Sequence, residues 1–247
     1  MNPSVSTATL YPENDGNPLA ENSTQFKWIM KLFGNIHTMF GDRPDVFVAS
    51  DLLWYHDKDN PDKRLAPDVM VVFGRPDKHR STYLQWDEDD IPAQVVFEIR
   101  SPSNDDEEMT DKLQDYDEWG VQEYYVYDPD RNIFQIYERG LQTLRLIRPT
   151  GPYFSKSLKI RFELTRETLE VYYPNGEPFL FLKAAQEQRI EAQRQRAEAE
   201  QRADAEQRQR LEAEQRYTRF RELSRKARLQ QASPDELAEL ERLELES

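Results

Sequence analysis

The C-terminal quarter of the chain constrains the fold most strongly, because its sequence favours a long helix over any sheet. Residues 184–232 contain no glycine or proline, consist mainly of good helix formers, and repeat the tetrad AEQR three times. Asp204 interrupts the heptad position that Ile190 and Leu211 share, which leaves only a weak coiled-coil seam. We predict a solvated charged helix over residues 184–232, with a weak coiled coil that forms a homodimer as the alternative. A short helix, begun by the sequence Ser-Pro-Asp-Glu, is predicted over residues 233–247.

The charge of the chain changes at the same place as its composition. The whole chain has 33 basic and 47 acidic residues and a net charge of −14. After Lys183 there are 13 basic and 15 acidic residues, so most of the negative charge belongs to residues 1–183. Domains that bind nucleic acid mainly through phosphate neutralisation usually carry a basic patch. The acidic body argues against that mode of binding and is compatible with carboxylates gathered around a cation.

Several classes of protein are excluded by what the sequence lacks. Without cysteine there is no disulfide framework, thiolate metal site or catalytic thiol, and an intracellular protein is the default expectation. The apolar runs are only a few residues long, far below the roughly 20 residues of a membrane helix. The N-terminal segment MNPSVSTATLYPENDGNP has neither a basic start nor an apolar core. We therefore expect a cytoplasmic protein with no membrane span and no secretory signal.

The first three quarters of the chain have the pattern of one folded domain behind a flexible arm. Residues 1–18 contain three prolines and no periodicity, which predicts the arm. Apolar residues then recur at steps of three and four up to Phe40, which predicts a helix that begins at Asn22, with Gln25 completing a capping box. Later segments are predicted as strands over 46–55, 65–73 and 94–101, a helix over 105–119, and a strand meander over 123–182. This order predicts an α/β (α+β) domain over residues 19–183.

Two carboxylates occur where apolar strands would normally exclude them. Asp68 precedes the apolar run 69–73, and Glu98 interrupts the apolar run 94–99. Burying a carboxylate is costly unless it is hydrogen-bonded or paired. Taken singly, Asp68 could accept backbone amides at the start of its strand, and Glu98 could form a cross-strand or same-face ion pair. On neighbouring strands, however, the two can converge on one divalent ion, and hard oxygen ligands favour Mg²⁺ over zinc.

Lys112 is the third candidate, in the helix predicted over residues 105–119. It borders the apolar stripe of that helix, one turn before Tyr116. A lysine in an acidic helix is most often solvated. Because only a short loop separates Glu98 from this helix, the ammonium group could instead return to the carboxylates.

Three segments occur together in an order and spacing that are specific, although each alone would be weak. They are APDVMVV, VVFEIRSPSN and DKLQDYDEWGVQEYYVYDP. Together they resemble the bacterial restriction-endonuclease-like family of the PD-(D/E)xK nuclease superfamily. The resemblance spans residues 19–182 and implies a restriction-endonuclease-like core, with a central mixed sheet flanked by helices. It also implies hydrolysis of phosphodiester bonds with Mg²⁺, or Mn²⁺ as an alternative, and DNA as the expected substrate.

The same resemblance implies a set of metal ligands. Asp68 matches the aspartate of the PD motif, and Glu98 matches the acidic residue of the ExK motif. These two carboxylates and the backbone carbonyl of Ile99 would hold the Mg²⁺ ion. Glu21, just ahead of the first long helix, resembles the acidic residue that many superfamily members place there as an accessory metal ligand.

The position at which the motif expects a lysine holds Arg100, which is a departure from the family pattern. Arginine cannot lose a proton near neutrality, so it could stabilise negative charge but not act as a base. Lys112 matches the helix lysine of this family and would supply the missing ammonium group, orienting the attacking water or stabilising the developing charge.

Two functions of different classes follow from the sequence. The first is a Mg²⁺-dependent endonuclease that uses Asp68, Glu98 and Lys112. The alternative is a catalytically weak or inactive nuclease-like adaptor that assembles through its charged C-terminal helix, which Arg100 and the acidic body favour. If the site exists, the carboxylates of Asp68 and Glu98 should lie within about 3–5 Å of each other, as ligands of one ion must.

Overall fold

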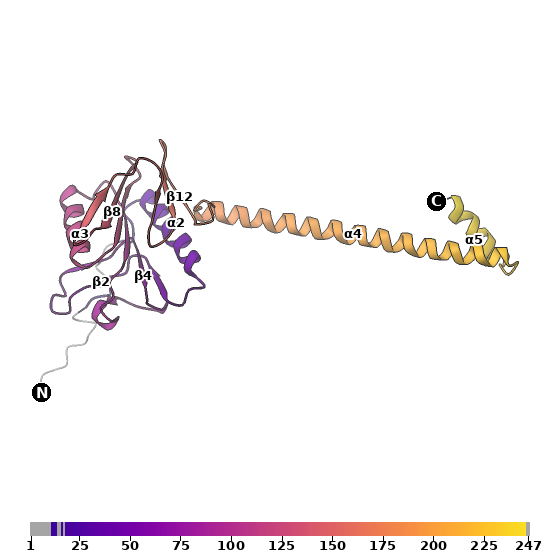
Figure 1. The fold of residues 1–247 in the computed structure, drawn as a ribbon, viewed down its shortest axis with the longest axis horizontal. Coiled ribbons are helices and arrows are strands. Elements are labelled where there is room, and N and C mark those ends of the chain that lie inside the picture. Colours follow the sequence, from indigo (N-terminus) through magenta and orange to yellow (C-terminus); the bar gives the residue numbers. More distant parts are fainter. Residues whose placement is uncertain (1–10, 14–15, 17, 246–247) are drawn as a thin grey trace, which may run out of the picture. The chain divides into compact units, whose positions relative to one another are not determined.

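The structure is a computed structural model that describes residues 11–13, 16 and 18–245 (Figure 1). It divides into two compact units, Met1–Ala185 and Gln186–Ser247. The arm predicted over residues 1–18 falls mostly outside the described residues and stays a prediction.

A six-stranded mixed sheet forms the centre of the first unit. Its strands are β1 (Val46–Ala49), β4 (Val69–Phe73), β6 (Val95–Ile99), β7 (Glu123–Asp128), β8 (Ile133–Arg139) and β9 (Leu144–Ile147). They lie in the order β1-β4-β6-β7-β8-β9. Only β6 and β7 are parallel neighbours, as expected for two strands joined through a helix. The predicted α/β fold with a central mixed sheet is confirmed.

Helices cover both faces of this sheet, α2 (Ser23–Phe40) on one side and α3 (Asp106–Glu118) on the other (Figure 1). Alternate residues of each central strand point to opposite faces. Val69 of β4 therefore joins the core under α2, whereas Met70 joins the core under α3. Burial on both faces explains why the central strands read as unbroken apolar runs.

The ends of these two helices follow from local sequence. Asn22 caps α2, because its side-chain oxygen accepts the backbone N–H groups of Thr24 and Gln25. After α3 the chain turns at Gly120, whose φ of 93° lies in the left-handed region that glycine adopts without strain.

Two segments predicted as single strands are each divided, so the prediction is wrong there. The segment 46–55 forms β1 and then β2 (Trp54–Tyr55) in a different sheet, with Asp51 at a φ of 52° between them. The segment 65–73 forms β3 (Arg64–Leu65) and β4, separated by Pro67, which has no N–H to give to a strand ladder.

Two three-stranded sheets complete the first unit. One has the order β3-β2-β5, with β5 over Tyr83–Leu84 followed by a 3-10 turn over Gln85–Asp87. The other has the order β10-β11-β12, formed by Tyr153–Phe154, Arg161–Leu164 and Leu169–Tyr172.

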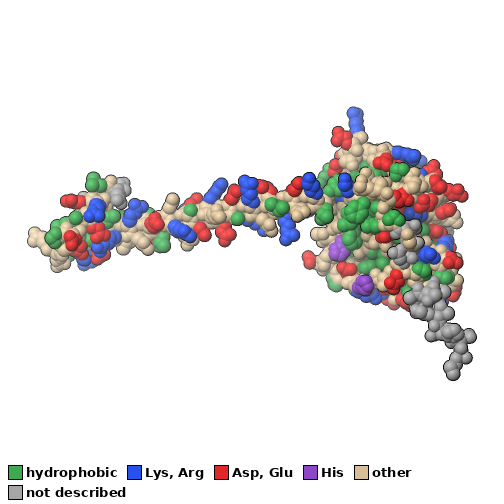
Figure 2. All heavy atoms as spheres, turned by 180° about the vertical axis from the view of Figure 1, so that it is seen from behind, with side chains coloured by type: hydrophobic (Ala, Val, Ile, Leu, Met, Phe, Trp, Pro, Cys, Tyr) green, Lys and Arg blue, Asp and Glu red, His purple; other side chains and the backbone are tan. Residues whose placement is uncertain are grey.

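The charged segment forms the 47-residue helix α4 (Leu182–Arg228). Acidic and basic side chains are interspersed along it (Figure 2). The helix ends at Arg228, before the limit at residue 232 that the composition suggested, and Gln230 adopts a φ of 55° just beyond it. None of the described helices is long and apolar enough to cross a membrane.

A second helix, α5 (Pro234–Leu245), folds against the end of α4. Ser233 and Glu236 form the expected reciprocal cap, each side chain accepting the backbone N–H of the other. Two ion pairs join the helices, Arg219 with Glu239 at 2.8 Å and Lys226 with Glu236 at 2.7 Å.

Candidate active site

The register of two antiparallel strands brings Asp68 and Glu98 together. The last pair between the two strands is Val69 of β4 with Phe97 of β6, and extending that register by one residue brings Asp68 opposite Glu98. Directly opposed residues of an antiparallel pair share a face of the sheet, with Cβ atoms about 4.5–5.5 Å apart. The two carboxylates that the sequence singled out therefore lie on the same face, the one covered by α3.

Asp68 is held from the neighbouring strand. Its Oδ2 accepts the backbone N–H of Ile99 at 2.6 Å. The sequence offered a hydrogen bond from a backbone amide as the simple explanation for Asp68, and such a bond is present. Its donor, however, lies on β6 and not at the start of β4. Burial raises the pKa of the Asp68 carboxyl well above its usual range, and the nearby charge of Glu98 raises it further. A cation between the two carboxylates would relieve that cost.

Helix α3 holds Glu98 with two side chains one turn apart. The Lys112 ammonium donates to Oε2 at 3.0 Å, and the Tyr116 hydroxyl donates to Oε1 at 2.6 Å. Glu98 itself is only 4% exposed. This explains how a carboxylate is tolerated in the middle of an apolar strand.

Lys112 remains a cation in this setting. Burial alone would lower its pKa, but the negative charges of Glu98 and Asp68 and the hydrogen bond to Glu98 raise the pKa above its ordinary value. A second carboxylate, Glu108, lies 3.4 Å away one turn earlier on α3. The group is therefore suited to stabilising negative charge and not to accepting a proton.

Tyr116 was not identified from the sequence as a partner of Glu98. We predict that Tyr116→Phe lowers the free energy of unfolding by about 1.5–3 kcal/mol, because Glu98 would lose a hydrogen bond in a buried place. Urea denaturation measures this. Tyr124→Phe is the matched control, since the buried Tyr124 hydroxyl has no hydrogen-bond partner among the described residues. An equal loss in both variants would show that the bond to Glu98 contributes nothing.

Arg100 does not join this group. Its guanidinium donates to the Asn104 carbonyl at 2.9 Å and pairs with Asp106 at 2.5 Å. Among the described residues none of its hydrogen bonds or ion pairs goes to Asp68 or Glu98. The ion pair that the sequence offered as the alternative for Glu98 is present, but its partner is Lys112 and not Arg100. The ion pair of Arg100 ties the end of β6 to the first turn of α3.

Gln25 links the two remaining predicted ligands. Its Oε1 accepts the backbone N–H of Glu21 at 2.9 Å, and its Nε2 donates to the Ile99 carbonyl at 2.9 Å. The predicted capping box is thus wrong in detail, because the Gln25 side chain reaches Glu21 rather than Asn22. The Ile99 carbonyl already accepts one hydrogen bond, which leaves one lone pair for a cation. The Glu21 carboxylate accepts the hydroxyl of Ser101.

The sequence did contain a sign that Gln25 has a special role, because it is a polar residue at a position where the helical periodicity expects an apolar one. Gln25 lies one turn before Ile29 on the apolar face of α2, and only 7% of it is exposed. A buried amide needs partners, and in this position they are backbone groups of residues distant in sequence.

These groups open into a polar cleft with a volume of about 520 Å³. Four carboxylates besides Asp68 line it, those of Glu21, Asp51, Asp62 and Glu108, together with two cations, Lys112 and Arg64. Buried Glu98 is bonded to Lys112 but is not itself part of the lining.

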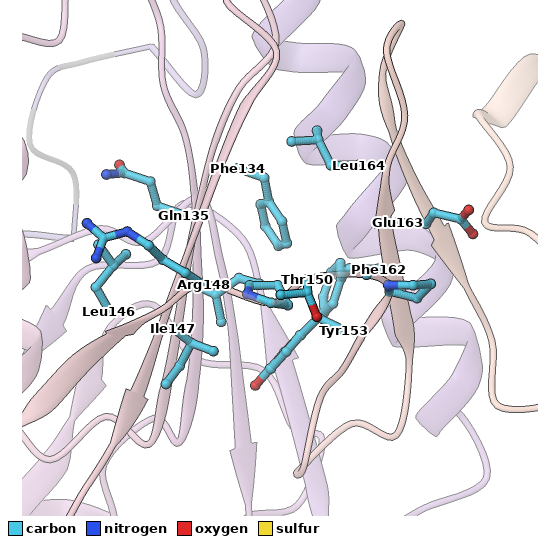
Figure 3. A pocket seen from close by; sticks show the side chains of 14 residues that line it. Phe134, Gln135, Leu146, Ile147, Arg148, Thr150, Tyr153, Phe162, Glu163 and Leu164 are labelled. Atoms are coloured by element: carbon cyan, nitrogen blue, oxygen red, sulfur yellow. The ribbon is translucent and has the colours of Figure 1, made fainter.

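A second cleft, of about 620 Å³, lies between β8, β9 and the β10–β11 hairpin (Figure 3). Phe134, Tyr153 and Phe162 point into it, and its one carboxylate, Glu163, is paired with Arg161. This cleft lacks a second carboxylate and is less suited to hold a divalent cation.

The donor atoms of Asp68 and of the adjacent β6 residues Glu98 and Ile99 fit one Mg²⁺ ion by their chemistry. Mg²⁺ is typically held by one or two carboxylates with waters and phosphate oxygens. Asp68, Glu98 and the free lone pair of Ile99 would supply that set. No cluster of three or more acidic or histidine side chains that could hold a metal occurs among the described residues, so the site would not be an all-carboxylate cage.

Comparison with known proteins shows the family of this chain. Residues 14–167, more than half of the chain, match the Uma2 family, described as "Putative restriction endonuclease". No curated protein matches. A solved structure from Anabaena variabilis ATCC 29413, described as a putative nuclease of DUF820, is 16% identical, with a TM-score of 0.43 over 56% of this chain and 75% of that one. The length of the family match shows that the chain belongs to the Uma2 family of putative restriction endonucleases.

Proposed function

We propose that this protein is a Mg²⁺-dependent endonuclease that hydrolyses phosphodiester bonds in DNA. Its family supports a nuclease-type function, a divalent metal and a nucleic-acid substrate. The proposal is supported by the Lys112 ammonium 3.0 Å from Glu98 and by the bond that the Asp68 carboxylate accepts from the backbone N–H of Ile99, the residue after Glu98. Two acidic groups and one permanent cation at the edge of a polar cleft are the parts that metal-assisted hydrolysis requires.

In this proposal each residue has a distinct role. Asp68, Glu98 and the Ile99 carbonyl would hold the Mg²⁺, which lowers the pKa of a bound water and screens the phosphate charge. Lys112 would stabilise the negative charge that develops on the phosphate oxygens. Tyr116 and Gln25 would act indirectly, by fixing Glu98 and the Ile99 carbonyl. Glu21 lines the same cleft but forms no three-carboxylate cluster with Asp68 and Glu98 among the described residues, so it has no ligand role in this proposal. Arg100 is left out because its guanidinium serves the turn before α3.

Incubation of the purified full chain with plasmid DNA and Mg²⁺ or Mn²⁺ tests this function. We expect nicked or linear product from the wild type and loss of that product from Glu98→Ala. Cleavage that survives Glu98→Ala and Lys112→Ala would mean that the site lies elsewhere.

The alternative function is a non-catalytic nuclease-like adaptor. One observation favours it: the position at which the motif expects lysine holds an arginine whose contacts lie outside the carboxylate pair. Absence of cleavage of any nucleic acid by the wild type, with either metal, would support this alternative.

The oligomeric state can be tested separately. Because apolar residues are sparse along α4, we expect the full chain to have the mass of a monomer in light scattering. A dimer mass that is lost when the chain is ended at Lys183 would instead support the weak coiled coil.

A further inference from the structure

Two cations line the carboxylate cleft, and within the described part of the chain no carboxylate neutralises one of them, Arg64. The other cation there, Lys112, is bound to Glu98 and Glu108. The Arg64 guanidinium donates from Nη1 to the Pro61 carbonyl at 3.2 Å, and it forms no ion pair within 4 Å among the described residues. This holds although Asp62 lines the same cleft two residues away.

Most arginines of the first unit, unlike Arg64, are paired with a carboxylate. Seven of them form ion pairs, namely Arg43, Arg75, Arg80, Arg100, Arg131, Arg139 and Arg161. Arg64, Arg145, Arg148 and Arg166 form none within the described part of the chain, and of these only Arg64 lines the carboxylate cleft. In so acidic a unit, a guanidinium kept clear of carboxylates is available for another anion.

The backbone that carries Arg64 is firmly held. Arg64 pairs with Tyr55 in the β2–β3 ladder, and its neighbour Leu65 pairs with Trp54. Tyr55 and Trp54 are fully buried. The side chain is half-buried at the wall of the cleft, and only one of its five N–H donors has the Pro61 carbonyl as partner. The remaining donors can meet a phosphate group in the paired geometry that guanidinium groups adopt with phosphate.

We propose that Arg64 binds the backbone phosphate of DNA adjacent to the one that is cleaved. The inference rests on the proposed nuclease function and extends it to substrate binding. The carboxylates of the cleft would repel a phosphodiester chain, and the metal and Lys112 offset that repulsion only at the reacting phosphate. A neighbouring phosphate in the same cleft needs its own cation, and Arg64 supplies it.

Binding of fluorescein-labelled duplex DNA, followed by anisotropy with Ca²⁺ in place of Mg²⁺, tests the inference together with cleavage kinetics in Mg²⁺. Arg64→Gln removes the charge and keeps a donor for the Pro61 carbonyl. We expect its Kd and KM to rise roughly tenfold with kcat changed less than about twofold, because binding a non-reacting phosphate stabilises ground and transition states alike. The slope of log Kd against log salt should become shallower by about the amount that one phosphate contact contributes.

Two further variants separate the outcomes. Arg64→Lys should recover part of the affinity, since it keeps the charge and loses the planar fork. Arg148→Ala removes an arginine without an ion pair from the other cleft and should leave Kd within about twofold. If the wild type binds and cleaves DNA but Arg64→Gln behaves like Arg148→Ala, the role of Arg64 is wrong. If the wild type neither binds nor cleaves, the nuclease function itself is wrong and the role of Arg64 falls with it.

Discussion

Replacement of Lys112 by alanine should lower the rate of DNA cleavage by about 10²- to 10³-fold. The Lys112 ammonium is a fixed positive charge beside the carboxylate pair, and loss of one such group that stabilises developing charge typically has an effect of this size. Single-turnover cleavage of a labelled duplex at saturating Mg²⁺ measures it. The substitution leaves Glu98 with only the Tyr116 hydroxyl, so its folding must be checked by circular dichroism.

Lys63 provides the matched control for Lys112. Its ammonium also bonds helix α3, at Asp115 and Glu118, but not the carboxylate pair. Lys63→Ala should therefore retain cleavage within about twofold, because it loses only a partly exposed ion pair. Lys112→Arg keeps the charge and separates loss of charge from loss of folding. A folded Lys112→Ala variant that cleaves as fast as Lys63→Ala would remove Lys112 from the mechanism.

The Asp68→Asn variant should lose at least about 10³-fold in cleavage without losing stability. The loss follows from removal of a metal ligand, since metal assistance contributes several kcal/mol and each 1.36 kcal/mol is tenfold in rate. Stability should be kept because the asparagine oxygen can still accept the Ile99 N–H. Burial and Glu98 disfavour the ionised form of Asp68, so a neutral side chain relieves repulsion.

Thermal unfolding at pH 8 in the absence of divalent metal measures the second half of this prediction. The midpoint for Asp68→Asn should equal or exceed that of the wild type. Asp62→Asn is the control, because Asp62 lines the same cleft without lying opposite Glu98. A midpoint several degrees below the wild type would mean that the Asp68 carboxylate stabilises the fold, and its position opposite Glu98 would then need no metal to explain it.

The fold was predictable where local patterns and burial agree. The apolar runs around Val69 and Val95 form central strands, as predicted. Asn22 marks the start of α2 and Gly120 the end of α3, as their residue types favour. The divided strands were not predictable from periodicity, because the left-handed turn at Asp51 and the break at Pro67 move adjacent apolar residues into different sheets.

The candidate site was predictable only in its acidic pair and its lysine. Asp68 and Glu98 stood out because each departs from an apolar strand, and Lys112 because the loop that follows Glu98 is short. The partners that hold them were not predictable, since Tyr116 and Gln25 have the same apolar-face positions as ordinary core residues. The contact of Arg100 with the Asn104 carbonyl depends on the backbone path of the turn before α3, and no sequence pattern in this segment predicts that path.

The position of a bound metal ion would show directly whether Asp68 and Glu98 form the metal site. Crystals of the full chain soaked in Mn²⁺ should give one anomalous difference peak between Asp68 and Glu98, about 2 Å from an oxygen of each carboxylate. The same peak should be absent from crystals of Asp68→Asn. A peak elsewhere on the molecule, or none at these carboxylates while the wild type still cleaves DNA, would contradict the account.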